Sequence, residues 1–405
     1  MPEETCEVLI VGGGPTGLLL AALLAQRGVD VRLVERRSAP STHSRAIGLH
    51  PPALAALEAV GLGEAAVAAG VPIRGGSARS RGRELGRLSF ERVWPGRPFV
   101  LSLPQSRTEE LLEERLAALA PGAMRRGWEV TAVRETREGA LVTARCATDA
   151  APSRLRARVV VGADGARSRV RDLLGVGTTG GPYPDAYLMG DFADPTGAEH
   201  DRGTVLHLEP DGIIESFPLP GGRRRWVAHT GSAPPPVADP ADLTEIVRSR
   251  TGETPAAASV SMISGFTVRR RTARRLVTAR CVLIGDAAHE ISPIGGQGIT
   301  LGWLDALDLA PLLHRAVADG SCEPLPDQLA WQTFERTCRR RARVAGTLAH
   351  VNMALGRPLP APLLALRDLA VRAALRTPAR RAMAWAYSMG WVRSMPSSPP
   401  GRPAH

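Results

Sequence analysis

The 405-residue sequence contains no lysine, so arginine supplies all 51 of its basic side chains. With 40 acidic residues these give a net charge of +11, which on its own suggests an anionic partner such as nucleic acid. Aromatic residues make up only 4% of the chain, and none is interleaved within the short arginine clusters at 223–225, 269–271 and 339–341. Because single-stranded nucleic acids are bound by stacking aromatics within a basic groove, we expect no nucleic-acid partner.

Cysteine is also scarce, and its spacing excludes two kinds of site. The chain has 5 cysteines, at positions 6, 146, 281, 322 and 338, and no pair is spaced as C-x-x-C. Neither a disulfide framework nor a metal site is therefore expected. The sequence also lacks an apolar run long enough to cross a bilayer, and its N-terminus enters an apolar strand without a leader. We expect a cytoplasmic protein with no stable membrane insertion; the sequence indicates no oligomeric state.

The most informative stretch is residues 6–35. An apolar run ends in Gly12-Gly13-Gly14-Pro15-Thr16-Gly17, an apolar helix follows, and a second apolar run ends in Glu35. This order of strand, tight turn, helix and strand predicts a dinucleotide-binding βαβ unit.

Each glycine of the turn has a physical task in such a unit. Gly12 permits the tight turn, Gly14 lets a pyrophosphate approach the backbone, and Gly17 lets helix and strand pack closely. The helix N-terminus presents free amide groups to phosphate. Glu35 stands at the right distance to accept hydrogen bonds from the adenosine ribose, which favours FAD or NAD over NADP.

Two further strand ends carry glycine and an acidic residue. The first is Gly162-Ala163-Asp164-Gly165, after the apolar run 157–161. The second is Gly285-Asp286, which continues to Pro293-Ile294-Gly295-Gly296-Gln297-Gly298 and an apolar helix over 299–313. The N-terminus of this helix would aim several amides at one point, where negative charge is favoured.

The segments between these motifs predict the remaining elements. Ser106-Arg107-Thr108-Glu109 matches a capping box and predicts a helix over 109–119, with Gln105 in the strand-to-helix junction before it. Residues 71–100 and 179–266 show short alternating runs separated by turns, which predict a mostly antiparallel sheet. Beyond residue 320 we expect helices to about residue 393 and then a disordered tail.

The three strand ends, in this order and spacing, resemble those of the single-component FAD-dependent aromatic monooxygenases, which include p-hydroxybenzoate hydroxylase and the aromatic polyketide hydroxylases. The resemblance spans about residues 6–345. It implies an α/β fold with a Rossmann-like FAD-binding domain, a mostly antiparallel β-sheet substrate domain and C-terminal helices. The expected boundaries are 1–74, 101–178 and 270–345 for the discontinuous FAD-binding domain, 75–100 and 179–269 for the substrate domain, and 346–405 for the C-terminal helices and disordered tail.

The resemblance also implies which residues bind FAD. Those expected at the ADP half are Gly12, Gly14, Pro15, Thr16, Gly17, Glu35 and Arg36. Those expected at the pyrophosphate and ribityl chain are Arg45, Gln105 and Asp286. Those expected beside the isoalloxazine are Pro293, Gly295, Gly296, Gln297 and Gly298. Asp164 and Gly165 resemble the family's second fingerprint, which contacts FAD and the nicotinamide donor.

The implied activity is that of an FAD-dependent, NAD(P)H-consuming monooxygenase. With O2 it would hydroxylate or epoxidise an aromatic, polyketide-like or prenylated small molecule through a flavin C4a-hydroperoxide, in specialised metabolite or antibiotic biosynthesis. Two alternatives stay open: an FAD-dependent oxidoreductase, such as an isoprenoid reductase, that inserts no oxygen, and a flavin-binding protein without catalysis. The choice between NADH and NADPH is open as well.

The sequence identifies no catalytic base. A phenolic substrate would call for one, because deprotonation makes the ring more reactive. The titratable candidates in the predicted sheet are Tyr183, His207, Glu215 and His229, and each has an ordinary structural interpretation beside the catalytic one.

Other conspicuous side chains also allow two interpretations. His289 invites a catalytic role, but we interpret it as a structural hydrogen-bonding residue. Trp385, Met389 and Trp391 could touch a membrane or cover the substrate, and packing against the second domain is favoured. His50 and Arg107 could equally be solvent-facing loop residues.

Overall fold

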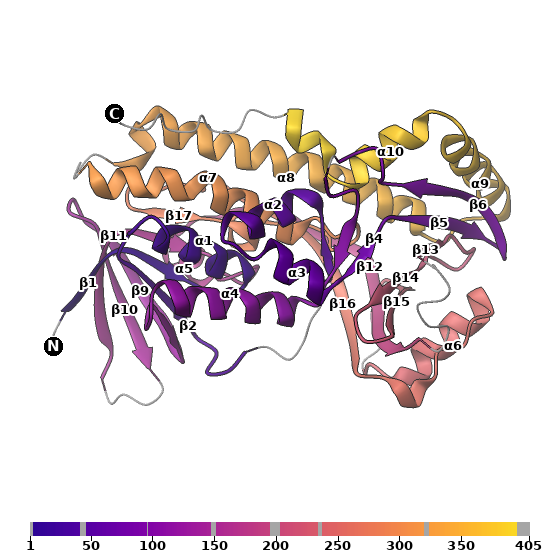
Figure 1. Cartoon of the computed structure of the whole chain (residues 1–405), viewed down its shortest axis with the longest axis horizontal. Coiled ribbons are helices and arrows are strands. Elements are labelled where there is room, and N and C mark those ends of the chain that lie inside the picture. The colour runs from indigo at the N-terminus through magenta and orange to yellow at the C-terminus, as the bar shows by residue number, and fades with distance from the viewer. Residues whose placement is uncertain are drawn as a thin grey trace.

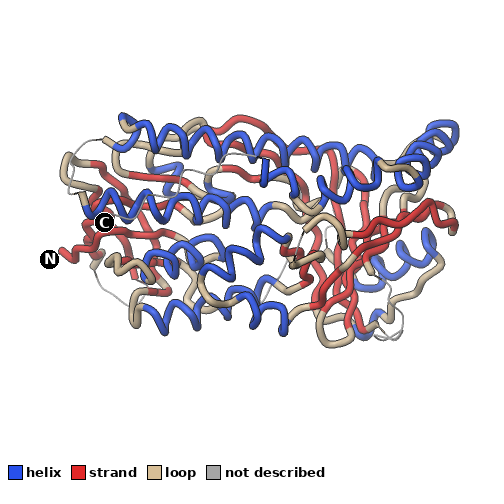
Figure 2. Tube along the Cα trace, turned by 45° about the horizontal axis from the view of Figure 1, so that its top comes forward, coloured by secondary structure: helices blue, strands red, loops and turns tan. Residues whose placement is uncertain are grey.

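The computed structural model describes residues 3–40, 46–94, 96–146, 151–194, 203–233, 237–319 and 324–394. They form two large sheets, one toward each end of an elongated molecule, and a small third sheet between them (Figures 1 and 2). Two long helices, α7 (Gly298–Ala318) and α8 (Leu329–Gly356), run along the long axis (Figure 1). The predicted α/β class with a mostly antiparallel second sheet is confirmed.

The first sheet has seven strands and a parallel centre. Its order is β8-β2-β1-β11-β10-β9, with β17 beside β11. The bounds are β1 (Glu3–Val11), β2 (Val31–Glu35), β8 (Met124–Arg126), β9 (Trp128–Glu135), β10 (Ala140–Cys146), β11 (Ser153–Gly162) and β17 (Cys281–Leu283). β10 pairs antiparallel with both of its neighbours, β9 and β11. The other pairs of the sheet are parallel. Residues 8–10 and 159–161 are buried on both faces, as expected where helices cover a parallel sheet.

Helix α1 (Pro15–Ala25) packs against both α4 (Gln105–Leu119) and α7. Because it is enclosed in this way, α1 is apolar on every side and its residues 17–24 are all buried. The enclosed helix fixes the turn before it against the sheet.

The capping-box prediction for α4 is wrong. The helix begins at Gln105 and not at Glu109, with Pro104 at its N-cap. The φ of Pro104, −55°, suits the residue before a first turn, and the Thr108 amide donates to the Pro104 carbonyl oxygen at 3.1 Å. Glu109 therefore lies inside the helix, where it accepts a hydrogen bond from Gln105 Nε2 at 2.8 Å.

The second sheet has eight strands in the order β18-β16-β12-β15-β14-β13-β5-β6. The bounds are β5 (Gly75–Ser80), β6 (Arg83–Ser89), β12 (Thr178–Ala193), β13 (Thr204–His207), β14 (Ile214–Leu219), β15 (Arg223–Gly231), β16 (Met262–Ala273) and β18 (His289–Glu290). Neighbours are antiparallel except β13 and β5, which pair in parallel. Helix α6 (Pro240–Thr251) covers one face, where Leu243 and Val247 pack on Leu188, Ile214 and Trp226. The opposite face turns toward the rest of the molecule.

Short elements and the C-terminal helices complete the fold. The third sheet has the order β3-β7-β4. The bounds are β3 (Gly48–Leu49), β4 (Val71–Ile73), β7 (Val100–Ser102), α2 (Pro51–Ala59), α3 (Gly63–Ala69), α5 (Arg169–Leu173), α9 (Ala361–Arg376) and α10 (Ala379–Tyr387). Figure 1 shows α9 and α10 beside β6 at the end of the molecule away from the first sheet. The predicted domain boundaries stay a prediction.

The conspicuous C-terminal side chains pack mostly inside the molecule. Met389 and Trp391 are buried in a cluster with Leu301 and Leu304 of α7, whereas Trp385 is 42% exposed. Met389 and Trp391 therefore pack inside the molecule, but against α7, within the predicted FAD-binding segment 270–345, and not against the second domain as expected. Through the residues that the structure describes, no helix is both long and apolar enough to span a bilayer.

We expect Asp191→Ala to weaken the second sheet. Arg225 on β15 is 1% exposed and donates two hydrogen bonds to the Asp191 carboxylate, from Nε to Oδ1 at 2.6 Å and from Nη2 to Oδ2 at 2.8 Å. Removing one partner of a buried ion pair leaves the other charge poorly compensated, at a cost of about 3–5 kcal/mol in the free energy of unfolding. Urea unfolding followed by circular dichroism measures this loss.

Glu245→Ala is the matched control. It removes a carboxylate from the exposed pair of Glu245 with Arg248, where the side chains are 61% and 55% exposed. Water screens such a pair, so the expected loss is at most about 1 kcal/mol. Equal losses for the two substitutions would contradict the structural role of the Asp191–Arg225 pair.

Candidate functional site

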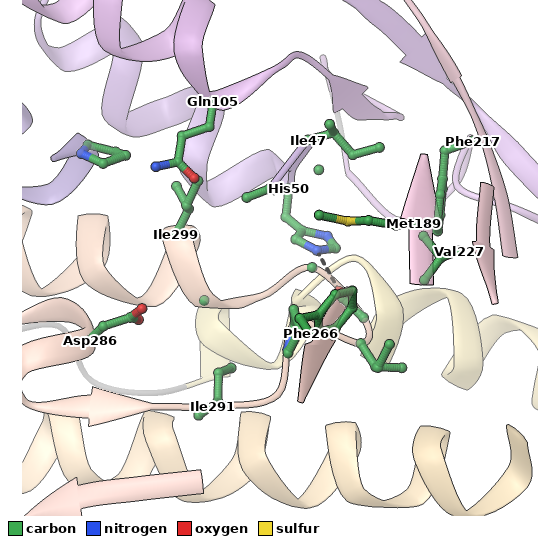
Figure 3. A pocket seen from close by; sticks show the side chains of 18 of the residues that line it. Ile47, His50, Gln105, Met189, Phe217, Val227, Phe266, Asp286, Ile291 and Ile299 are labelled. Atoms are coloured by element: carbon green, nitrogen blue, oxygen red, sulfur yellow. Dashed lines mark hydrogen bonds between the residues drawn. The ribbon is translucent and has the colours of Figure 1, made fainter. Parts of the chain in front are cut away.

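A cavity of about 870 Å³ lies between the first and second sheets. Figure 3 shows Gln105 and Asp286 at one side of it, His50 in the middle, and Phe217 and Val227 at the other side. We call the part lined by Gly12, Gly14, Pro15, Thr16, Glu35, Asp164 and Asp286 the turn half, and the part lined by the second sheet the sheet half. The volume falls in the range of sites that enclose cofactors and small ligands.

The turn after β1 opens the turn half to a ligand. Gly12 has a φ of +112°, which favours glycine. A Cβ on Gly14 would meet no atom within 4 Å, so the space beside this residue is open. Gly14 is also the N-cap of α1, where no side chain caps the helix and no acidic residue lies in the first turn. The first amides of α1 are thus available to an anionic ligand.

Glu35 ends β2 with both carboxylate oxygens engaged. Oε2 accepts a hydrogen bond from the Gly13 amide at 2.7 Å, and Oε1 accepts from the amide and the Nε of Arg37, each at 2.9 Å. Burial opposes ionisation, but the hydrogen bonds from Arg37 and Gly13 outweigh it and lower the pKa of Glu35 below its usual value. A fixed carboxylate therefore borders the turn half.

Asp164 lines the same half, but its carboxylate faces the protein. Oδ2 accepts hydrogen bonds from the amides of Arg169 and Val170 at 2.7 and 3.0 Å, which satisfies the N-terminus of α5. Ser168 donates to Oδ1. Gly165, with a φ of +80°, turns the chain beside it and also lines the cavity. In the second fingerprint, therefore, the Asp164 carboxylate holds the backbone turn at Gly165 in place, and this turn lines the cavity.

Gln105 and Asp286 enter the cavity from different elements, α4 and the turn after β17 (Figure 3). Gln105 lines the cavity together with Glu109, its hydrogen-bond partner. Asp286 is open to the cavity, but the surrounding protein desolvates its charged form and raises the pKa of its carboxyl to about 6, against the opposing effect of His289. Of the other predicted residues, Arg36 lines the cavity and Arg45 lies outside the described residues.

The turn before α7 crosses the middle of the cavity. Gly295 and Gly296 have φ values of +98° and +66°, and both line the cavity together with Pro293 and Gly298. Gln297 is buried and does not line it, and Gly17 is likewise absent from the lining. The predicted residues of this motif therefore come together here, except the Gln297 side chain.

His50 is a cavity residue to which sequence reasoning gave no role. It is 5% exposed, and its Nε2 lies 3.1 Å from the carbonyl oxygen of Gly295. Burial lowers the pKa of His50 to about 4, so the neutral ring donates from Nε2 to this carbonyl. The only signal in the sequence was a histidine between an apolar strand and Pro51-Pro52. Arg107, by contrast, forms an exposed pair with Glu110.

The sheet half is mainly apolar. Its apolar lining includes Ile73, Leu88, Phe90, Met189, Leu206, Leu208, Ile213, Phe217, Val227, Phe266, Val371, Leu375 and Met383. Its polar lining includes Ser77, Thr204, Glu215, Arg225, Thr267, Arg269, Asn352 and Tyr387. Of the four titratable candidates, Glu215 lines the cavity, whereas Tyr183, His207 and His229 do not. His229 Nε2 lies 3.3 Å from Asp185 Oδ1. His289 is also buried, with Nε2 2.6 Å from Asp305 Oδ2, which agrees with its structural interpretation.

The turn half fits FAD through its open space at Gly14, its uncapped helix N-terminus and its fixed acid at Glu35. The sequence profile of the family described as "FAD binding domain" matches residues 5–342. The chain belongs to this FAD-binding family. FAD is its cofactor.

Relatives in this FAD-binding family include monooxygenases of Streptomyces rimosus. The chain is 35% identical over 343 residues to 6-methylpretetramide 4-monooxygenase, across 82% of this chain and 60% of the relative. It is 34% identical over 362 residues to 12-dehydrotetracycline 5-monooxygenase/anhydrotetracycline 6-monooxygenase, across 84% of this chain and 68% of the relative. The chain thus spans 60% and 68% of the lengths of these two proteins.

A solved structure of p-nitrophenol 4-monooxygenase from Pseudomonas putida shares the fold of this FAD-binding protein. The TM-score is 0.83 at 23% identity, and the match covers 96% of this chain and 98% of that chain. At this identity the likeness concerns the fold alone.

We expect Gly14→Val to weaken FAD binding without disturbing the fold. The new side chain meets no protein atom near Cβ, and Gly14 has an extended backbone with φ −83° and ψ −178°, which valine adopts easily. Its methyl groups would occupy the space into which the uncapped amides of α1 point. Titration of the apoprotein with FAD, followed by quenching of flavin fluorescence, should show affinity reduced by about tenfold or more, equivalent to about 1.4 kcal/mol.

Gly181→Val on β12 is the matched control, because a Cβ there also meets nothing within 4 Å and the residue does not line the cavity. It should leave FAD affinity unchanged. If Gly14→Val bound FAD as tightly as the control, the assignment of the pyrophosphate to the N-terminus of α1 would be wrong.

Proposed function

We propose that the chain is an FAD-dependent monooxygenase that uses NAD(P)H and O2 to hydroxylate or epoxidise an aromatic, polyketide-like or prenylated small molecule, in specialised metabolite or antibiotic biosynthesis. The observation that carries the proposal is that the cavity is continuous: its turn half, with the dinucleotide-binding turn, opens into its mainly apolar sheet half. The names of its relatives support oxygen insertion over a reductase or a non-catalytic flavoprotein.

In this proposal the turn half holds the ADP part of FAD. The uncapped amides of α1 bind the pyrophosphate beside Gly14, and Glu35 accepts from the ribose with the lone pair of Oε2 that Gly13 leaves free. Asp164 acts indirectly, because its carboxylate caps α5 and so fixes the turn at Gly165. Gln105 and Asp286 supply polar groups further along the cavity.

The turn before α7 and the sheet half surround the reacting ring. When bound, FAD supplies the redox chemistry that activates O2. At the N-terminus of α7, the backbone amides after Gly296 favour negative charge near them, and His50 holds the Gly295 carbonyl. The apolar residues of the sheet half exclude water from the substrate.

The test is incorporation of oxygen from labelled O2. FAD-loaded protein would be given NADPH or NADH under ¹⁸O2 with anhydrotetracycline or 4-nitrophenol as probe substrates. We expect substrate-dependent NAD(P)H oxidation, with one ¹⁸O atom in the product by mass spectrometry, because a monooxygenase transfers one atom of O2 to the substrate.

Gly14→Val, prepared without FAD, is the control for background chemistry and should show neither reaction. A product reduced by NAD(P)H without ¹⁸O would identify a reductase. A lack of NAD(P)H oxidation with both probes and a wider panel of phenols would contradict the monooxygenase and favour a flavoprotein without catalysis.

A further inference from the structure

Glu215 interrupts a row of apolar side chains on the second sheet. On β14 it lies opposite Leu206 of β13 and opposite Val227 of β15, and Val227 in turn lies opposite Met189 of β12. All of these residues line the cavity. Because successive strand residues alternate between faces, Ile214 points to the other face, where it packs with Trp226 and Leu243 near α6. Glu215 therefore places a carboxyl in an otherwise apolar row that faces the cavity.

The Glu215 carboxyl lacks a partner among the described residues. It is 8% exposed, and neither a hydrogen bond nor an ion pair offsets its desolvation. Buried acids in proteins normally have such a partner, since an unpaired buried charge costs several kcal/mol. Asp191 shows the usual solution on the same sheet, because Arg225 binds it with two hydrogen bonds. The open side of Glu215 is the cavity.

The groups around Glu215 do not neutralise it. Arg225, the cation on the neighbouring strand, is held by Asp191. The Tyr387 hydroxyl donates to Asn352 Oδ1 at 2.8 Å, and the Tyr187 hydroxyl is buried without a partner in the described structure. Burial and then the charge of Glu215 raise the pKa of both tyrosines, that of Tyr387 to about 12, so both stay protonated.

The other elements packed against β14 bring no cation to this row. β4 and β7 carry no titratable side chain. His207 follows Leu206 on β13 and thus points to the other face, where its ring lies 6.3 Å from that of Trp226. Helix α6 also covers that other face.

We propose that Glu215 accepts the hydrogen bond of a substrate hydroxyl, so that the sheet half selects ring systems with a phenolic or enolic hydroxyl and rejects rings that carry a carboxylate at that position. The selection follows from charge: a hydroxyl donates to the carboxylate, an ether lacks the donor, and a second carboxylate is repelled in a chamber of low polarity. The inference rests on the proposed function and adds the residue that recognises the substrate.

The same contact gives Glu215 a role in proton transfer. The phenolic O–H bond breaks, its electron pair stays on the substrate oxygen, and the proton passes to a carboxylate oxygen of Glu215. The ring gains electron density and becomes easier to oxygenate. Burial raises the pKa of Glu215 to about 7, so the accepting form increases as the pH rises through this value.

The test measures binding and needs no turnover. FAD-loaded protein is titrated with 2-naphthol, 2-methoxynaphthalene and 2-naphthoate at about pH 6 and about pH 8, on either side of the pKa of Glu215, and the change in flavin absorbance gives each affinity. At about pH 8 we expect the wild type to prefer 2-naphthol to its methyl ether by about tenfold or more, the factor for one hydrogen bond to a charged group. This preference should shrink at about pH 6, and 2-naphthoate should bind weakest at about pH 8.

Glu215→Gln keeps the size of the side chain and removes its charge. It should lose most of the preference for 2-naphthol, its pH dependence and the rejection of 2-naphthoate. Because the variant also removes an unpaired buried charge, we expect it to fold and to unfold at a higher temperature than the wild type at about pH 8. Glu84→Gln is the control, since it removes an exposed carboxylate paired with Arg87, and it should behave as the wild type.

Two results would overturn the inference: a wild type without preference among the probes, or a Glu215→Gln variant that keeps both the preference and its pH dependence. A failure of the monooxygenase proposal would be distinguishable from a failure of this inference. If the binding preferences hold but no ¹⁸O enters any substrate, Glu215 is still the hydroxyl acceptor of a protein with another reaction.

Discussion

The close approach of three backbone segments at Gly12 is the constraint on which the cofactor site depends. A Cβ at Gly12 would lie 2.5 Å from the carbonyl oxygen of Ala163, and a Cβ at Gly17 would lie 2.0 Å from the carbonyl oxygen of Gly12. No side chain fits at such distances, so β1, α1 and β11 meet only through glycine. Their meeting gathers the uncapped N-terminus of α1, the acid that ends β2 and the turn at Gly165 around one space, because parallel strands end at the same edge of a sheet.

The turn half could be predicted because its signals are local. The glycines, the apolar strands around them and the acid of the next strand all fall within 36 residues, and each follows from backbone geometry. The sequence does not reveal which protein groups donate hydrogen bonds to an acidic side chain that is also expected to contact the cofactor. Asp164 caps α5, and Glu35 already accepts from Gly13 and Arg37, although each also lines the cavity. The start of α4 was missed for a similar reason, since a capping-box pattern and an N-cap proline compete within six residues.

The sheet half depends on pairings between distant segments, so alternation alone could not predict it. β13 pairs in parallel with β5, which brings residues 204–207 beside residues 76–79. The period of a strand tells which residues share a face, but not which face meets the cavity. His50 is similar, because its hydrogen bond joins residues 245 positions apart. Only the assembled fold reveals that this histidine supports the turn before α7.

Glu215 and Asp191 show how one sheet can carry a structural acid and a binding acid. Asp191 meets Arg225 inside the sheet, so its charge is compensated, and loss of either side chain would leave the other charge buried without this partner. Glu215 has a folded pKa of about 7 against a usual value of 4.5, so the folded state binds its proton more tightly than the unfolded state does. Its contribution to stability is therefore lost as the pH rises from the usual value to about 7, by about 3 kcal/mol at most. The protein thus loses stability by keeping an unpaired carboxylate at the wall of the cavity. Because no group among the described residues compensates this charge, a ligand in the cavity is suited to do so.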